Sequence, residues 1–474
     1  MVTSTALAFK QNAREALADA GLQKALAFSK PQFMARRANA VAALPEFEQL
    51  RDIGRDIKNH ALANLDFYLE TYAANVEARG GHVHWASTAE DARAAILAIC
   101  RAAGATTVTK GKSMVSEEIA INDYLEQAGI QPIETDLGEY VIQLRHEHPS
   151  HIIAPAFHLN REDWEATFRA AHTDLPPTRV FAERRDILTE ARTRLRQKFL
   201  SADVGITGAN FLVAETGSSI IVTNEGNGDL TQTLPRVHIV LASIEKVVPT
   251  LEDATSLLRL LARSATGQDF SVYTTFSTGG RRPADLDGPE EYHVVLLDNG
   301  RSAMLGGEFQ EMLRCIRCAA CMNHCPVYGA VGGHAYGWVY PGPMGAVLTP
   351  SLIGVAEAGN LPNASTFCGK CESVCPVKIP LPKLMRHWRE REFERHLQPS
   401  GIRTNLRLWA WFAKRPALYR LGTRAAALAL GLLGRRRGRF ASMPLAGGWT
   451  AGRDLPAPEG DTFFARYARA QRAK

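Results

Sequence analysis

Seven of the eight cysteines lie in two short runs that span residues 315–376. The first run reads CIRCAACMNHCP and has the spacing C-x2-C-x2-C-x3-C-P, which is typical of bacterial ferredoxins. Three thiolates at this spacing can bind three corners of an iron–sulfur cluster, and the fourth cysteine is free to bind a second cluster. The second run reads CGKCESVCP, and Ser365 stands where a first cysteine would complete the same pattern. Together the two runs predict two iron–sulfur clusters.

Crossing the ligands between the two runs predicts which cysteines share a cluster. One complete 4Fe–4S cluster would be bound by Cys315, Cys318, Cys321 and Cys375. A second cluster would have only three thiolate ligands, Cys325, Cys368 and Cys371. Ser365 or solvent would fill its fourth position in a 4Fe–4S cluster, and a 3Fe–4S cluster would need no such ligand. His324 is interpreted as a neighbour rather than a ligand. A structural zinc site would favour two separated pairs of ligands instead.

Length and composition are those of an ordinary globular protein. The 474 residues suffice for two or three domains, and 46% hydrophobic with 22% charged residues is typical of soluble proteins. The first ten residues lack the basic and apolar regions of a signal peptide. The longest apolar run, 425–434, is shorter than the roughly 18 residues of a membrane-spanning helix. We therefore expect a cytoplasmic location and no disulfide framework.

Positive charge is concentrated at the end of the chain. Residues 401–474 contain 15 Lys and Arg against 3 Asp and Glu, a local charge of +12, so the first 400 residues carry −6 of the total +6. The segment also contains the aromatic stretch 408–412 and the basic stretch 435–437. Three interpretations compete: docking to an acidic partner subunit, contact with an anionic membrane surface, and nucleic-acid binding. No nucleic-acid-binding motif accompanies the charges, so we expect no nucleic-acid partner.

Strand and helix patterns alternate from about residue 80, after a helical region without recognisable chemistry. Candidate strands occur at 82–85, 106–110, 132–136, 151–155, 237–241 and 292–297. Candidate helices occur at 90–103, 116–128 and 251–264. This alternation predicts an α/β fold with a mostly parallel sheet and helices on both faces. Ligands of such sheets bind beyond the carboxyl ends of the strands.

Polar residues gather at several predicted strand ends, and the turn at 110–113 resembles an anion-binding turn. The candidate pocket residues are Lys110, Lys112, Glu134, Asp136, Asn210, Glu215, Thr216, Asn224 and Glu225. If a hydroxy acid were oxidised on this chain, Lys110 or Lys112 could bind its carboxylate and Glu215 could accept the hydroxyl proton. The alternative is a set of glycine-rich turns that satisfy their own backbone groups.

Other cofactors are not indicated by the sequence. No dinucleotide-binding fingerprint, phosphate-binding Walker loop or serine nucleophile elbow is present, so neither NAD, flavin nor ATP is expected. Four histidines at positions 146, 148, 151 and 158 have no recognised metal-binding spacing. We interpret them as ordinary polar residues.

In this order, the parts of the chain resemble the lactate utilization protein B family. The resemblance rests on the α/β region with residues 205–227, the cysteine runs with their missing eighth ligand, and the Trp- and Arg-rich tail, and it covers nearly the whole chain. It implies a helical region over 1–75 and an α/β LUD domain over 76–300, similar in fold to the NagB/RpiA/CoA-transferase group. A ferredoxin-type dicluster domain over 301–392 and a basic helical C-terminal region over 393–474 would follow.

The resemblance implies an iron–sulfur electron-transfer subunit, without a flavin, of a system that oxidises L-lactate to pyruvate. Its partners would be lactate utilization proteins A and C and a peripheral membrane or quinone-linked electron acceptor. The chain itself would be cytoplasmic or bound peripherally at the inner face of the membrane. The family's cluster ligands transfer to the seven cysteines of the two runs. Two alternatives stay open, a subunit of a glycolate or other 2-hydroxy acid oxidase and an iron–sulfur sensor of redox state or of a metabolite.

Overall fold

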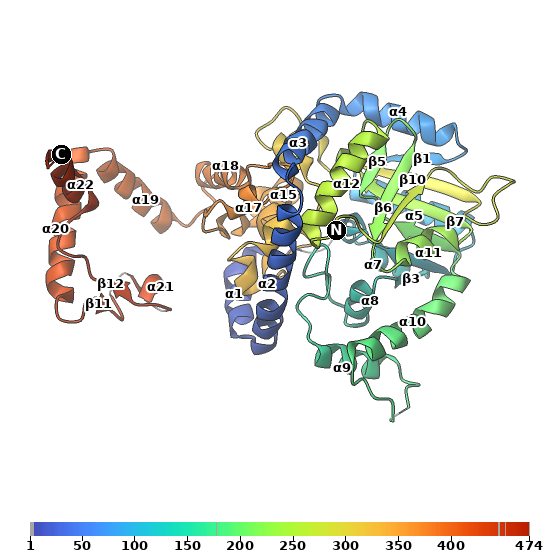
Figure 1. Cartoon of the computed structure of the whole chain (residues 1–474), viewed down its shortest axis with the longest axis horizontal. Coiled ribbons are helices and arrows are strands. Elements are labelled where there is room, and N and C mark those ends of the chain that lie inside the picture. The colour runs from blue at the N-terminus through green and yellow to red at the C-terminus, as the bar shows by residue number, and fades with distance from the viewer. Residues whose placement is uncertain (1–3, 177, 444–445, 451, 474) are drawn as a thin grey trace. The chain divides into compact units, whose positions relative to one another are not determined.

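The computed structural model describes residues 4–176, 178–443, 446–450 and 452–473. The chain forms two compact units that divide after Arg391. The first unit contains both larger sheets and the two cysteine runs (Figure 1). The second unit is mostly helical.

A six-stranded sheet, parallel throughout, forms the centre of the first unit. Across the sheet the strands are β1 (His82–Ala86), β10 (Glu291–Leu297), β7 (Val237–Ser243), β4 (Val204–Thr207), β2 (Thr107–Gly111) and β3 (Gln131–Glu134). From β2 the chain moves outward to β3, returns to β4 on the other side of β2, and continues to β7 and β10. The connections reverse direction between β2 and β4, which makes this the topological switch point of the sheet.

Helices flank this sheet and precede it (Figure 1). In the first part of the unit they are α1 (Phe9–Ala18), α2 (Ala20–Ala42), α3 (Phe47–Ala63), α4 (Leu65–Glu77), α5 (Ala89–Ala102), α6 (Met114–Glu118), α7 (Ile121–Gln127), α8 (Leu137–Leu144), α9 (Arg161–Ala171), α10 (Arg184–Ser201), α11 (Asn227–Thr233) and α12 (Leu251–Ala265). Around the cysteine runs they are α13 (Ala320–Asn323), α14 (Tyr328–Val331), α15 (Gly342–Ile353), α16 (Val355–Ala358), α17 (Lys370–Ser373) and α18 (Leu381–Glu394).

Successive side chains of each strand point to opposite faces of the sheet, which gives the first unit two apolar layers. Ile239 and Leu241 of β7 pack with α5, α6 and α7 on one face. Val240 and Ala242 of the same strand pack with α4 on the other face. A smaller sheet also lies on that second side, with strands in the order β8 (Val247–Val248), β5 (Phe211–Val213), β6 (Ser218–Thr223) and β9 (Tyr273–Ser277).

The predicted α/β class with a mostly parallel sheet is confirmed, and so are the helices before it. The predicted strand at 151–155 is wrong, because this segment forms turns in which Ile152 and Ile153 pack against the cysteine region. The predicted helix at 116–128 is divided into α6 and α7 at Ala120, whose φ of 51° interrupts the helical backbone. The central strand β4 was not among the candidate strands, since its four residues, with a glycine, show little periodicity.

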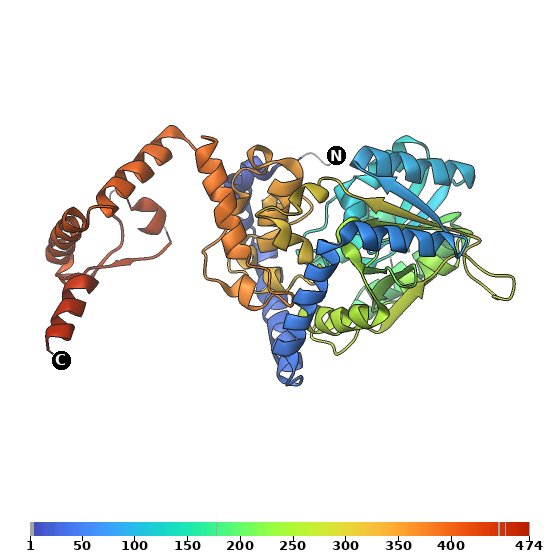
Figure 2. The ribbon, with the colours of Figure 1, turned by 90° about the horizontal axis from the view of Figure 1, so that it is seen from above.

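The helices at the start of the chain lie against the cysteine region in both views (Figure 2). Leu26 of α2 shares an apolar cluster with Cys325 and Tyr336. Arg37, also on α2, donates a hydrogen bond to the Val374 carbonyl at 2.9 Å. The first unit therefore joins the N-terminal helices, the α/β sheet and the cysteine runs into one packed body.

The second unit begins with α19 (Ser400–Ala413) and α20 (Pro416–Gly434). It ends with the strand pair β11 (Arg439–Phe440) and β12 (Leu455–Pro456), the short helix α21 (Gly447–Thr450) and α22 (Phe463–Arg472). Trp409 and Trp411 of α19 expose 61% and 47% of their surface. No described helix in either unit is both long enough and apolar enough to cross a membrane.

Candidate metal centres and a neighbouring pocket

The two cysteine runs repeat one backbone conformation. In each run a left-handed residue, Ala319 (φ 60°) or Gly369 (φ 77°), immediately precedes a one-turn helix, α13 or α17. Two residues earlier a second left-handed residue occurs in both runs, Arg317 (φ 59°) and Phe367 (φ 55°). Equivalent positions of the two runs can therefore be compared directly.

Ser365 stands in the repeat where Cys315 stands in the first run. The backbone N–H of Arg317 donates a hydrogen bond to Cys315 Sγ at 3.4 Å. The backbone N–H of Phe367 donates the equivalent bond to Ser365 Oγ at 3.1 Å. The serine hydroxyl is thus held by the same local bond as the cysteine thiol.

Four thiols from both runs line one cavity, which we call the first site: Cys315, Cys318, Cys321 and Cys375. The other lining residues are apolar apart from their backbone, and they include Ile152, Met312 and Met344. The Ile379 N–H donates a hydrogen bond to Cys375 Sγ at 3.4 Å, as the Arg317 N–H does to Cys315. Four thiols with backbone N–H donors in an apolar enclosure suit an iron–sulfur cluster, so these residues fit the predicted group.

Buried cations surround the first site. Arg51 is 7% exposed and donates two hydrogen bonds to the Cys375 carbonyl, at 3.0 and 2.7 Å. Lys58 is 1% exposed and donates to the Glu245 carbonyl. Burial lowers the pKa of Lys58 to about 8, while the charges of Glu245 and Cys315 oppose that fall. Burial raises the pKa of the Cys375 thiol to about 11, and the positive charge of Arg51 opposes that rise.

The other three cysteines form a second site that is partly open to solvent. Cys325 and Cys371 are buried, whereas Cys368 is exposed. Burial raises the pKa of the Cys371 thiol to about 12, and the nearby Cys325 and Cys368 thiols add to this rise. The Tyr328 N–H donates a hydrogen bond to Cys325 Sγ at 3.5 Å. The structure therefore brings these three thiols together and leaves one of them at the surface.

Tyr336 is fully buried beside the second site, in the same apolar cluster as Cys325. Among the described residues its hydroxyl has no hydrogen-bond partner. Burial raises its pKa, and the thiols of Cys325, Cys321 and Cys371 contribute, so the hydroxyl lies near them. A buried hydroxyl without a partner costs about 1–3 kcal/mol. A bound group that accepts a hydrogen bond would remove this cost, and the second site also fits the predicted cluster.

A separate pocket of about 150 Å³ lies at the carboxyl ends of the parallel strands. Its lining includes Lys112 and Ser113 after β2, Asp136 after β3, and Ala209 and Asn210 after β4. The pocket therefore occupies the switch point between β2 and β4, where parallel sheets bind their ligands.

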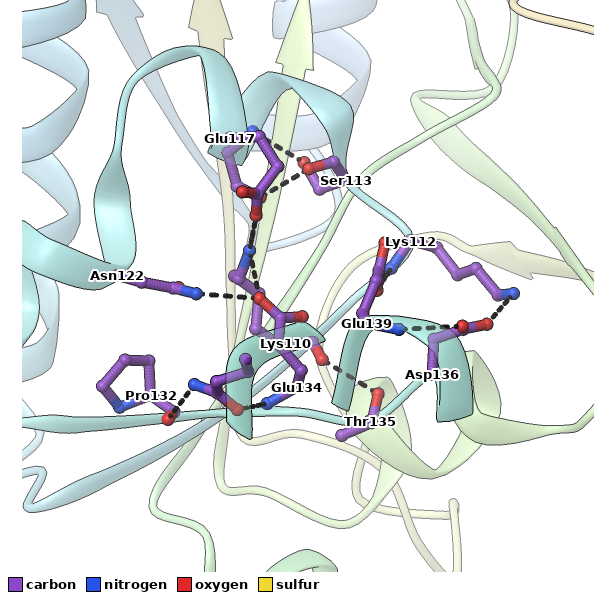
Figure 3. A network of polar contacts seen from close by, with 12 residues as sticks. Lys110, Lys112, Ser113, Glu117, Asn122, Pro132, Glu134, Thr135, Asp136 and Glu139 are labelled. Carbon is purple, nitrogen blue, oxygen red and sulfur yellow. Dashed lines mark hydrogen bonds and ion pairs between the residues drawn. The ribbon is translucent and has the colours of Figure 1, made fainter. Parts of the chain in front are cut away.

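The polar wall of this pocket is an ion-paired network (Figure 3). Lys112 pairs with Asp136, and with Glu225 at 3.2 Å. Glu139 accepts a hydrogen bond from the Lys112 N–H at 3.2 Å. Burial raises the pKa of Glu139 well above its ordinary value, and the neighbouring carboxylates of Glu134 and Asp136 raise it further. The neutral form of Glu139 is therefore favoured, and Asp136 and Glu225 form the ion pairs with Lys112.

The pocket adjoins the first site. Ile152 lines both the thiol cavity and the pocket. Arg317, which lies between the first two cysteines, also lines the pocket and pairs with Glu245 at 3.1 Å. Its guanidinium lies over the ring of Tyr340 at 4.8 Å. A single layer of side chains thus separates the pocket from the four thiols.

Three family models match consecutive parts of the chain. They describe a LUD domain over residues 69–297, a 4Fe-4S dicluster domain over 311–379 and the C-terminal region of lactate utilisation protein B over 392–472. The lactate utilization protein B of Macrococcus caseolyticus is 43% identical, over 96% of this chain and 95% of its own length. That of Shouchella clausii is 44% identical over the same shares.

The chain belongs to the lactate utilization protein B family. A further relative, named uncharacterized electron transport protein YkgF, from Escherichia coli K12, is 41% identical over 98% of this chain and 97% of its own length. The dicluster match confirms the prediction of an iron–sulfur protein of this family.

Within this family member the structure separates the predicted pocket residues into three groups. Lys112, Asp136, Asn210 and Asn224 line the pocket, and Glu225 reaches it through its ion pair with Lys112. Lys110 and Glu134 form a buried ion pair at 2.6 Å that does not line it (Figure 3). Because Lys110 also pairs with Glu117 at 2.7 Å, its charge is already balanced within the chain.

Glu215 and Thr216 lie away from the pocket. Glu215 is exposed, and its carboxylate accepts a hydrogen bond from the Leu251 N–H at the start of α12. Thr216 donates to the Ser218 hydroxyl at 2.8 Å within the turn before β6. The structure gives Glu215 no position from which to accept a proton from a ligand in the pocket.

Sequence reasoning did not identify Lys246, Arg317 or Ile152 as pocket residues. Arg317 could have been noticed because it lies inside the first cysteine run. The other two residues carry no local signal and reach the pocket only through tertiary packing.

The histidines at 146, 148, 151 and 158 remain without an assigned metal. His151 is buried and bonded to Asn323 at 3.0 Å, and His158 bonds to Ser150 and Glu147, each at 2.8 Å. Among the described residues, none of these four histidines belongs to a group of three or more His, Cys, Asp or Glu side chains that could hold a single metal ion.

Proposed function

We propose that this chain is the iron–sulfur electron-transfer subunit of a system that oxidises L-lactate to pyruvate together with lactate utilization proteins A and C. Family membership and the names of its relatives support the lactate substrate. The observation that carries the electron-transfer role is the shared cavity, in which Cys375 of the second run meets three thiols of the first. This is the crossed arrangement of a two-cluster ferredoxin.

In this proposal the first site holds a 4Fe–4S cluster on Cys315, Cys318, Cys321 and Cys375. The second site holds another on Cys325, Cys368 and Cys371. When bound, such clusters accept and release single electrons. The protein encloses the first site, supplies N–H donors to its sulfurs, and places Arg51 and Lys58 where their charges offset those of the thiolates.

Ser365 is proposed as the fourth ligand of the second site. It holds the position of Cys315 in the repeated backbone, and its hydroxyl accepts the equivalent backbone hydrogen bond. An alkoxide oxygen can complete a site that three thiolates leave open, so a full 4Fe–4S cluster is expected there. Solvent at this position, or a 3Fe–4S cluster, is the alternative.

The exposed Cys368 makes the second site the place where electrons enter or leave the chain. The second unit supports docking of a partner, because α19 exposes Trp409 and Trp411 among an excess of basic residues. Aromatic and basic side chains on one surface suit an acidic partner subunit. An anionic membrane surface near the electron acceptor is the alternative occupant.

Reduction of the chain by substrate tests this proposal. The full-length protein, purified anaerobically with its clusters, is mixed with proteins A and C and with L-lactate, and bleaching of the visible absorbance is followed. We expect reduction only when L-lactate and both partners are present. Faster reduction by glycolate would show that the substrate is another 2-hydroxy acid rather than lactate. No reduction by any such acid would contradict the proposal.

A further inference from the structure

The pocket at the switch point contains a lysine that has no carboxylate partner of its own among the described residues. Lys246 lines it, and its ammonium group donates to the Ala209 carbonyl. Within the described parts of the chain, Lys246 forms no ion pair with a carboxylate, unlike Lys112 and Arg317 in the same wall. Burial lowers the pKa of Lys246 to about 8, so the side chain is still charged at neutral pH.

The acids around Lys246 are already shared by other cations. Glu245 pairs with Arg301 at 3.0 Å and with Arg317 at 3.1 Å. Arg301 also forms a bidentate pair with Glu118, whose carboxylate is completely buried. Both buried carboxylates are thus engaged by Arg301 and Arg317, and neither forms an ion pair with Lys246. A buried charge of this kind requires a partner.

The neutral part of the wall suits a small organic acid. The carboxamide oxygen of Asn210 accepts the Val222 N–H at 3.0 Å, which fixes the side chain and leaves its amide nitrogen available. Ile152 and Ile153 supply an apolar side. A volume of about 150 Å³ has room for several water molecules, and therefore for a three- or four-carbon acid.

The loops that form the pocket are tightly held. A Cβ atom at Gly208, after β4, would lie 2.4 Å from the Lys112 carbonyl oxygen after β2. Only glycine allows the two strand ends of the switch point to approach this closely. Gly208 therefore allows the close spacing of the two strand ends that form this wall of the pocket.

We propose that this pocket binds a small 2-hydroxy or 2-oxo carboxylate, with Lys246 and Arg317 on the carboxylate and Asn210 on the neighbouring oxygen. The ligand would lie behind Ile152, one side-chain layer from the thiols of the first site. The inference rests on the proposed lactate function for its substrate class, and it assigns that class a binding site on this chain.

Calorimetric titration of the anaerobic, cluster-loaded chain with L-lactate and with pyruvate tests the proposal. We expect one site for at least one of these acids and at least a tenfold loss of affinity in Lys246→Met. Lys246→Arg should retain binding because it keeps the charge. Lys198→Met, on the exposed end of α10, serves as the matched control and should bind like the parent chain.

A second variant separates loss of binding from loss of folding. Ser271 lines the pocket and is half-buried, so Ser271→Trp should block the pocket with little effect on the core. Circular dichroism and iron content are measured on every variant. If the parent chain has both clusters but binds neither acid, or if Lys246→Met and Ser271→Trp bind normally, the inference is wrong while the electron-transfer proposal stands. A parent chain without clusters would instead overturn the proposed function.

Discussion

The two cysteine sites share one repeated backbone but lie in different surroundings. Three of the four thiol positions have direct counterparts, and Ser365 replaces the fourth. The first site is enclosed by apolar side chains and buried cations, whereas Cys368 of the second is exposed. The comparison indicates that the repeat fixes which groups can be ligands, and that the packing around each copy sets its exposure and charge.

The largest expected effect comes from removing two thiols of the first site, one from each run. Cys318→Ala combined with Cys375→Ala should abolish the first cluster and reduce the iron content by about half, because only two thiols would then line that cavity. Iron and sulfide analysis checks this. Cys100→Ala is the matched control, since Cys100 is buried on α5 away from both sites and should leave iron unchanged.

The next effect concerns Ser365. Ser365→Ala should convert the second cluster to a 3Fe–4S form, with a loss of about one iron and a new signal in the oxidised state. Ser365→Cys should instead keep the full cluster, because the repeated backbone already holds this position as it holds Cys315. Ser373→Ala, an exposed serine on α17, is the control. An unchanged cluster in Ser365→Ala would assign the fourth position to solvent.

A smaller effect is expected at Tyr336. Its unpartnered hydroxyl would stabilise the more negative, reduced state of the second cluster by a hydrogen bond. Tyr336→Phe should therefore lower the reduction potential of that cluster. A tenfold change in the equilibrium constant for one-electron reduction corresponds to a shift of about 59 mV. Redox titration followed by EPR measures it. Tyr328→Phe should not shift it, since that hydroxyl already donates to the Ser150 carbonyl at 2.8 Å. Equal shifts in both variants would contradict this role.

The smallest effect is a pH dependence at the junction of the α/β domain with the cysteine region. Burial lowers the pKa of His151 to about 4. Stability is lost as the pH falls below about 6.5, because the unfolded chain then binds a proton that the folded chain excludes. Between pH 7 and pH 5 the free energy of unfolding should fall by about 2 kcal/mol from this group. In anaerobic denaturant titrations, His151→Gln should lack this fall in the free energy of unfolding. If the pH dependence of the variant is unchanged, the fall comes from other groups.

Prediction from sequence worked best where the chemistry is local. The spacing of the cysteines and the place of Ser365 could be read directly, because each run forms its turn from neighbouring residues. Lys112 and Asp136 are predicted because they follow strands that end at the same edge of the sheet, and Asn210 is predicted from its polar, glycine-rich segment. The sequence around Ile152 predicts a strand, but this residue lies in turns and packs against the cysteine region instead.

The rest of the pocket depends on contacts between distant segments. Lys246 follows β7, and its role appears only when the ion pairs of Glu245 with Arg301 and Arg317 are known. The polar, glycine-rich segment around Glu215 predicts that this residue is an acid of the pocket. Its carboxylate instead accepts a hydrogen bond from the backbone at the start of α12. The local sequence around Lys246 and around Glu215 does not show that the lysine lines the pocket and that the glutamate does not.

EPR with iron and sulfide analysis on the anaerobically purified chain tests most directly whether the protein holds two unequal clusters. We predict roughly eight irons per chain and, after reduction, a signal from two interacting 4Fe–4S clusters. About seven irons with an oxidised 3Fe–4S signal would show that Ser365 is not a ligand. Tightly bound zinc without iron would contradict the electron-transfer function altogether.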